Sequence, residues 1–174
     1  ETVKLETLSS LKNFFPSYLD EIYIKKYSST EIKENIVNLA KDIVNECKLL
    51  ITNTELLNEK GKRIAIRKLE KMTIKVGFPE VVLDYFETKT SFNPQNYLQN
   101  CYTATKEKTL WRMKNVELYS DKFIWRDATF LPNAYYDPYT NSFTITAGFL
   151  QAPHYSMEFS YEEMLGKIGF VIAH

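Results

Sequence analysis

The feature that most constrains the fold of this 174-residue chain is a change in the spacing of its apolar residues. From Ile32 to Ile51, apolar side chains recur at the three- and four-residue intervals that place them on one face of an α-helix. From about Leu110 onward, β-branched and aromatic residues dominate, and residues 142–147 alternate between apolar and polar, which is typical of a strand. Helices followed by strands favour an α+β fold.

Three further stretches in the first two thirds of the chain predict helices. Residues 11–27 are rich in aromatic side chains and read as helical. A one-sided apolar pattern predicts another helix over residues 59–76, which Gly77 and then Pro79 would end in the usual manner of a helix stop. One more helix is expected near residues 94–106.

The strand region predicts a β-hairpin over residues 130–147. Its turn would lie at residues 137–141, where Asp, Pro and Asn provide turn chemistry. Pro132 cannot donate a backbone hydrogen bond, so the first strand of the hairpin is expected at a sheet edge. Residues 124–126 also have the composition of a strand.

A last helix is predicted to start after Ser160, which forms a capping box with Glu163. Gly166 and Gly169 lie inside it, and because glycine weakens a helix we expect both to pack closely against a neighbour. The apolar pattern continues to His174 without a stop signal, and the sequence begins without Met. We therefore expect a fragment of a longer protein.

Composition excludes several classes of protein. The chain carries 22 basic and 22 acidic side chains, so it lacks the basic excess of a protein that binds nucleic acid. Hydrophobic residues make up 44%, which is ordinary for a folded domain. No apolar run approaches the roughly 18 residues of a membrane span. Two cysteines, Cys47 and Cys101, make no disulfide framework, and the sequence does not decide whether they pair.

The residues themselves offer little chemistry. The chain has two histidines, His154 and His174, and lacks both a nucleophile elbow and a phosphate-binding glycine loop. A zinc-binding helix presents two histidines four residues apart, and here only the first position is present. Asn133 is either a turn residue or a hydrogen-bonding group for a peptide that adds as a strand. These observations alone name no function.

Four segments in a fixed order nevertheless resemble one family. They are residues 65–80 (AIRKLEKMTIKVGFPE), 132–138 (PNAYYDP), 141–153 (NSFTITAGFLQAP) and 160–174 (SYEEMLGKIGFVIAH). The second resembles the motif VNAYYxP, the third NxIxFPAGILQxP, and the fourth the start of GxIGxVIxHExxH. Together they resemble the neprilysin-like family of zinc metalloendopeptidases. The resemblance is strong from about residue 56 onward and weaker before it.

The resemblance implies roles for three residues. Asn133, through its side-chain amide, and Ala134, through its backbone, would hold the main chain of an extended peptide substrate. His174 would be the first zinc ligand, with the general-base Glu directly after it and the remaining ligands further on, so that zinc could activate water. Two positions depart from the family pattern: Thr146 replaces a Pro, and His154 replaces an aromatic residue. Both changes lie in the approach to the zinc helix.

The resemblance also implies an organisation. Residues 1–55 would be a helical segment, and residues 56–174 the N-terminal part of a thermolysin-like peptidase domain, α+β, with a small antiparallel hairpin and the start of the zinc helix. We expect peptide substrates, zinc in the complete protein, no activity and only weak zinc binding for the chain alone, and self-association of the chain alone. A non-catalytic peptide-binding module and a purely structural module remain alternatives. The compartment is left open.

Overall fold

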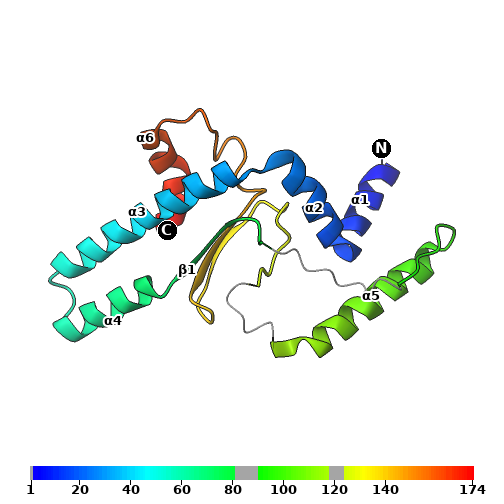
Figure 1. The fold of residues 1–174 in the computed structure, drawn as a ribbon, viewed down its shortest axis with the longest axis horizontal. Helices are drawn as coiled ribbons and strands as arrows, with labels where there is room; N and C mark the ends of the chain where they lie inside the picture. Colours follow the sequence, from blue (N-terminus) through cyan, green and yellow to red (C-terminus); the bar gives the residue numbers. More distant parts are fainter. Residues whose placement is uncertain (1, 81–89, 118–123) are drawn as a thin grey trace.

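The computed structural model describes residues 2–80, 90–117 and 124–174. The helices and strands in these parts, in chain order, are α1 (Thr2–Phe14), α2 (Pro16–Tyr27), α3 (Thr30–Asn53), α4 (Glu59–Glu70), β1 (Thr73–Gly77), α5 (Tyr97–Lys114), β2 (Ala134–Asp137), β3 (Ser142–Thr146), α6 (Tyr161–Met164), the π-helical turn Leu165–Gly169 and α7 (Phe170–Ala173). The α+β prediction is confirmed (Figure 1).

Three strands form one small mixed sheet at the centre of the molecule (Figure 1). The strand order is β1-β3-β2, so β2 is a terminal strand of the sheet that the described residues form. β2 and β3 pair antiparallel, with Ala134 opposite Ile145, as the predicted hairpin requires. β1 pairs with the other side of β3 in parallel, with Thr73 opposite Ser142. The sequence predicted only the antiparallel pair.

The helix predicted over residues 59–76 is wrong in its second part. α4 ends at Glu70, and residues 73–77 form β1 instead. The apolar residues Met72, Ile74 and Val76 alternate, and this short run fits a strand as well as the end of a helix. The strand forms because the backbone of residues 73–77 pairs with β3 in a parallel ladder. Local periodicity does not reveal such an interaction between segments that are distant in sequence.

The core lies between α3 and the sheet. α3 carries Ile36 and Leu39, which are 0% and 2% exposed, against Val76 of β1 and Ile145 of β3. Ser29 begins the helix by accepting a hydrogen bond from the backbone N–H of Ile32. The first part of the predicted apolar face, from Ile32 to Ile43, therefore forms one side of the core, whereas Leu50 near the end of α3 is 70% exposed.

The last helix starts as predicted and then widens. Ser160 and Glu163 form a complete capping box at the start of α6. A π-helical turn separates α6 from α7. A Cβ atom on the buried Gly169 would lie 3.6 Å from Cδ1 of Ile43 in α3, which confirms packing against a neighbouring helix at this glycine. At Gly166 no heavy atom lies within 4 Å of such a Cβ, so the same prediction is wrong there.

The remaining predictions concern parts of the chain outside this core. α5 runs from Tyr97 to Lys114, longer than the helix expected near residues 94–106, and it lies beside α1. Residues 124–126 form no strand. None of the helices in the described ranges is long and apolar enough to cross a lipid bilayer. The division of the chain between residues 55 and 56 stays a prediction.

Candidate functional site

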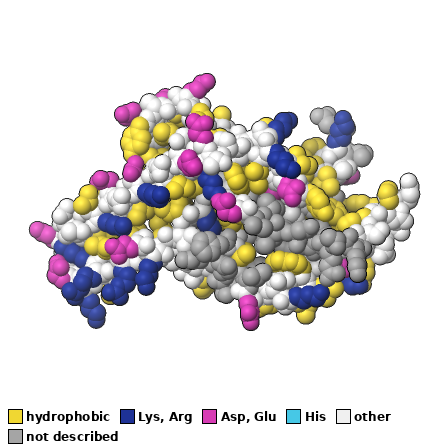
Figure 2. Space-filling view, in the orientation of Figure 1, with side chains coloured by type: hydrophobic (Ala, Val, Ile, Leu, Met, Phe, Trp, Pro, Cys, Tyr) yellow, Lys and Arg dark blue, Asp and Glu magenta, His cyan; other side chains and the backbone are white. Residues whose placement is uncertain are grey.

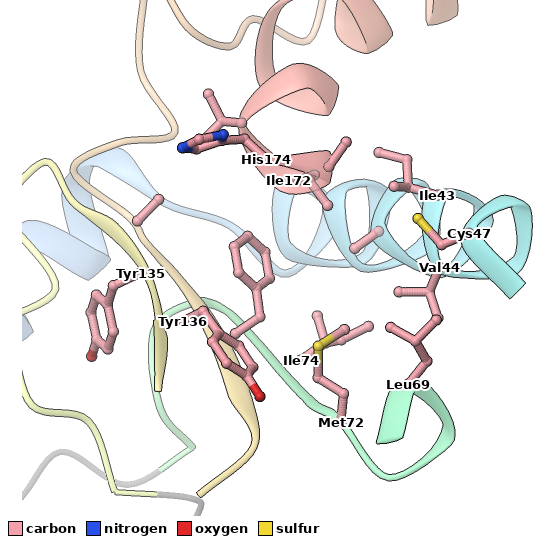
Figure 3. A pocket seen from close by; sticks show the side chains of 15 residues that line it. Ile43, Val44, Cys47, Leu69, Met72, Ile74, Tyr135, Tyr136, Ile172 and His174 are labelled. Carbon is pink, nitrogen blue, oxygen red and sulfur yellow. The ribbon is translucent and has the colours of Figure 1, made fainter. Parts of the chain in front are cut away.

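A pocket of about 460 Å³ lies where α3, α4, the sheet and α7 meet (Figure 3). Its lining residues are Ala40, Ile43, Val44, Cys47, Leu69, Met72, Ile74, Ala134, Tyr135, Tyr136, Phe143, Val171, Ile172, Ala173 and His174. Most of these side chains are apolar, so the pocket suits apolar groups, and the His174 imidazole and the Tyr135 and Tyr136 hydroxyls are its polar side-chain groups.

The pocket walls come from segments that are distant in sequence. Figure 3 shows Ile43, Val44 and Cys47 of α3 on one side, with Met72 and Ile74 below Ile172 of α7. Cys47 is a free, half-buried thiol among these apolar groups, and Cys101 is also free. Neither cysteine is part of a disulfide, which answers the question that the sequence left open.

His174 lies at the rim of this pocket, above the strands in Figure 3. Its backbone N–H donates to Phe170 O at 3.0 Å, so it continues the last helical turn. Its ring stacks on that of Phe170, with ring centroids 6.4 Å apart and an interplanar angle of 9°. The capping box and the π-turn set the register of α7, and that register brings the imidazole to the rim.

β2 contributes the opposite border. Ala134 lies opposite Ile145 in the antiparallel ladder, and Thr146 N–H donates to Asn133 O at 3.0 Å. Since ladder hydrogen bonds alternate along an antiparallel pair, the backbone N–H and C=O of Ala134 face away from β3. Ala134 therefore presents a donor and an acceptor on the side of β2 opposite β3.

The side chain of Asn133 is held by two contacts within the chain. Its Nδ2 donates to Asp127 Oδ2 at 2.7 Å, and its Oδ1 accepts from Ala134 N–H at 2.9 Å. An ionised carboxylate only accepts hydrogen bonds, so the nitrogen end of the amide faces Asp127. The amide thus covers the outward N–H of Ala134 in this conformation.

The three residues singled out in the sequence do not all meet at one place. Ala134 and His174 line the same pocket, whereas Asn133, next to Ala134, is outside its lining. Asp127 was not singled out in the sequence, and Thr146 was noted only because it replaces a Pro of the family pattern, although both residues bond Asn133. No local pattern assigns either residue a contact with Asn133, because each meets Asn133 only when the hairpin has formed.

Metal ligands are sparse around the pocket. In the described ranges of the chain, no group of three or more His, Cys, Asp or Glu side chains could hold a metal ion. His174 provides one imidazole at the pocket rim, and a zinc site needs at least three protein ligands. These residues by themselves therefore do not make a zinc site.

The far end of β2 is fixed by a buried charge. Asp137 is 4% exposed and pairs with Arg126, with 2.9 Å between its Oδ2 and Nη2. It also accepts from the Thr140 hydroxyl at 2.8 Å and from Tyr139 N–H at 3.1 Å. Burial by itself would raise the pKa of this carboxyl, but the two hydrogen bonds and the positive charge lower it below its ordinary value. The turn after β2 is therefore built around an ionised carboxylate.

Comparison with known proteins places the chain in a family. Two models, both described as Peptidase family M13, match residues 4–79 and residues 133–174. Together these ranges cover about two thirds of the chain and include α3, β1, the hairpin and the final helix. The second match includes every residue singled out from the resemblance.

Curated relatives agree with this assignment. A protein called neutral endopeptidase, from Lactococcus lactis subsp. lactis, is 28% identical over 170 residues, which cover 96% of this chain and 26% of the relative. Neprilysin-2 of Caenorhabditis elegans is 24% identical over 172 residues, covering 96% of this chain and 23% of that protein. The chain thus spans about a quarter of the length of these relatives.

Solved structures share the fold. PEPO from Lactobacillus rhamnosis superposes with a TM-score of 0.79 at 26% identity, over 92% of this chain and 26% of that one. A zinc metalloprotease of Mycobacterium tuberculosis, ZMP1 in complex with an inhibitor, has a TM-score of 0.78 at 22% identity, over 93% of this chain and 24% of that one. Sequence models, curated relatives and fold agree, and the chain belongs to peptidase family M13.

Proposed function

We propose that this chain is part of a zinc-dependent metalloendopeptidase that hydrolyses peptides by metal-activated water. The observation that carries the proposal is that Ala134 and His174, singled out by independent motifs, line one pocket. Membership of the family supports the reaction class, and the names of the curated relatives support peptides as the substrates.

In this proposal β2 binds the substrate as an additional strand. The outward N–H and C=O of Ala134 would pair with the main chain of an extended peptide, as in other cases of strand addition. The Asn133 amide, which now accepts from Ala134 N–H, would turn to hydrogen-bond the peptide as well. The apolar pocket beside β2 would take a substrate side chain.

His174 is proposed as one zinc ligand. Its ring nitrogens have no hydrogen-bond partner among the described residues, and it lies at the rim of the pocket above β2 (Figure 3). The other ligands and the general base would come from residues outside those that the structure describes. When bound, zinc would polarise the scissile carbonyl and acidify a water molecule.

An alternative is a non-catalytic peptide-binding or structural module. The single imidazole of the pocket favours this alternative, because peptide binding along β2 needs no metal. The two functions share the role of Ala134 and differ in the role of His174. Substitution of this histidine therefore separates them.

The test compares the two histidines in the full-length protein. His174→Ala is expected to lower peptide hydrolysis by more than about 100-fold and to reduce bound zinc, since even supporting residues of zinc ligands cost 10–100-fold. His154→Ala is the matched control, because His154 stacks on Phe149 with ring centroids 4.4 Å apart and does not line the pocket. Hydrolysis rates and zinc content are measured on the same samples.

The isolated chain provides a second comparison. Residues 1–174 alone are expected to show no hydrolysis and no tightly held zinc, because one histidine does not make a site. If the full-length protein cleaves peptides without sensitivity to chelators, or keeps its zinc after His174→Ala, the peptidase proposal is wrong. Peptide binding without hydrolysis would instead support the non-catalytic module.

A further inference from the structure

Thr146 makes an unusual set of contacts at the start of β2. It is the last residue of β3, it is 0% exposed, and it stands opposite Asn133 in the ladder. In a regular hydrogen-bonded pair each residue donates its N–H to the carbonyl of the other. Thr146 N–H does donate to Asn133 O at 3.0 Å, but the reverse bond is different.

The carbonyl of Thr146 does not accept the N–H of Asn133. It accepts the N–H of Phe149 instead, at 3.0 Å, because the chain turns away from the sheet directly after β3. The hydroxyl takes its place: Asn133 N–H donates to Thr146 Oγ1 at 3.0 Å. The hydroxyl hydrogen in turn is donated to a backbone carbonyl, that of Leu131 or of Asn133.

Residue 146 thus extends the ladder by one pair beyond the point where its own backbone leaves it. The side chain and N–H of Thr146 satisfy both backbone groups of Asn133. With the Asn133 peptide unit fixed against β3, the next residue, Ala134, must turn its N–H and C=O outward. A proline, which the resembled family carries at this position, could make neither contact because it has no N–H and no hydroxyl.

We propose that Thr146 is a positioning residue for the peptide-binding edge of β2, with its hydroxyl fixing Asn133 so that the Ala134 backbone faces the substrate. This inference rests on the proposed function of β2. Thr146 does not itself touch the substrate. It acts by removing the freedom of Asn133 to rotate away from β3.

The same strand contains a matched control. Thr144, two residues earlier, is also 0% exposed, but its hydroxyl has no hydrogen-bond partner among the described residues. Thr144→Val and Thr146→Val therefore make the same chemical change in the same strand. Only the second removes hydrogen bonds, and Thr146→Ser removes the methyl group while keeping them.

The experiment measures KM and kcat for peptide hydrolysis in the full-length protein. Thr146→Val is expected to raise KM about tenfold, equivalent to about 1.4 kcal/mol, with a smaller effect on kcat, because main-chain binding of the substrate is weakened in ground state and transition state alike. Thr146→Ser and Thr144→Val are expected to stay within about twofold of wild type. Thr146→Ala serves if the valine variant does not fold. An unchanged KM in Thr146→Val, or an equal loss in Thr146→Ser, overturns the proposal.

Backbone hydrogen exchange keeps this test separate from the proposed function. In Thr146→Val the amide of Asn133 loses its acceptor and is expected to exchange at least about tenfold faster, with no such change in Thr144→Val. If the wild-type protein hydrolyses no peptide, the proposed function fails and exchange alone decides the role of Thr146. Unchanged exchange at Asn133 then overturns the inference.

Discussion

Gly148 lies where the chain leaves β3 and passes directly against the backbone of the segment that leads into Asn133. A Cβ atom at Gly148 would lie 2.7 Å from the carbonyl carbon of Phe130 and 2.8 Å from that of Leu131. Gly148 N–H also donates to Thr129 O at 2.8 Å. Both neighbours are backbone atoms, so a side chain at this position can be accommodated only if the segment itself moves.

Gly148→Ala is therefore expected to lower the free energy of unfolding by about 1–3 kcal/mol or more, as overpacking does elsewhere. Gly166→Ala is the control, since a Cβ there meets nothing within 4 Å and alanine is the better helix former by up to about 1 kcal/mol. Urea denaturation of both variants measures the difference. Equal destabilisation by the two changes would show that the close approach at Gly148 does not limit stability.

Among the elements, those defined by local signals were predicted well. α3 follows from its one-sided apolar spacing, and α6 follows from the capping box of Ser160. β1 was missed because its partner is remote in sequence: β3 begins only at Ser142, and a five-residue segment with alternating apolar residues does not distinguish a strand from the end of a helix. Elements whose hydrogen bonds are internal could be read from sequence, and the parallel strand could not.

The residues of the candidate site also fall into two groups: those that short motifs identify and those whose contacts form only in the folded chain. Asn133, Ala134 and His174 were singled out through short motifs, and the structure brings two of them to one pocket. Asp127 was not singled out, and Thr146 was noted only as a departure from the family pattern, because the contacts of both residues with Asn133 depend on the hairpin pairing and on the turn after β3. Residue types alone do not say which of many Asp or Thr side chains will meet a given amide.

A buried carboxylate joins α2 to the segment before β2. Asp20 is 7% exposed, and its Oδ1 accepts from the Thr129 hydroxyl at 2.6 Å and from Phe130 N–H at 3.1 Å. Burial raises the pKa of this carboxyl above its ordinary value, and the hydrogen bonds offset part of that rise. The folded chain therefore holds the Asp20 proton more tightly than the unfolded chain.

This contact predicts a pH dependence of stability. A raised pKa in the folded state stabilises the fold below the ordinary pKa of aspartic acid, near 4, and this contribution is lost as pH rises through the raised value. The difference in unfolding free energy between wild type and Asp20→Asn is thus expected to fall with rising pH, in denaturation series at several pH values. Thr129→Val removes a hydrogen bond that lowers the pKa, so it should extend the fall to higher pH. A difference that grows with pH would contradict the assignment.

For the molecule as a whole, the net charge does not describe the surface, because charged and apolar side chains are unevenly distributed over it. The chain has a formal net charge of zero, yet Figure 2 shows Lys and Arg gathered over α4 and apolar side chains exposed along α3 and α4. The pocket between α3, β2 and α7 continues this apolar surface. Apolar surface of this kind tends to be covered by another protein surface.

The chain alone is accordingly expected to self-associate through the pocket walls as its concentration rises. Val44→Lys places a charge in that wall, and it should weaken association about tenfold or more, because burying an unpaired charge opposes contact. Asn45→Lys adds the same charge at the neighbouring exposed position of α3, outside the pocket, and should leave association nearly unchanged. Sedimentation velocity on residues 1–174 compares the three proteins at matched concentrations. Equal weakening by both lysines would indicate that added charge, rather than the pocket, governs association, whereas a wild-type chain that stays monomeric throughout would show that the pocket walls do not drive contact.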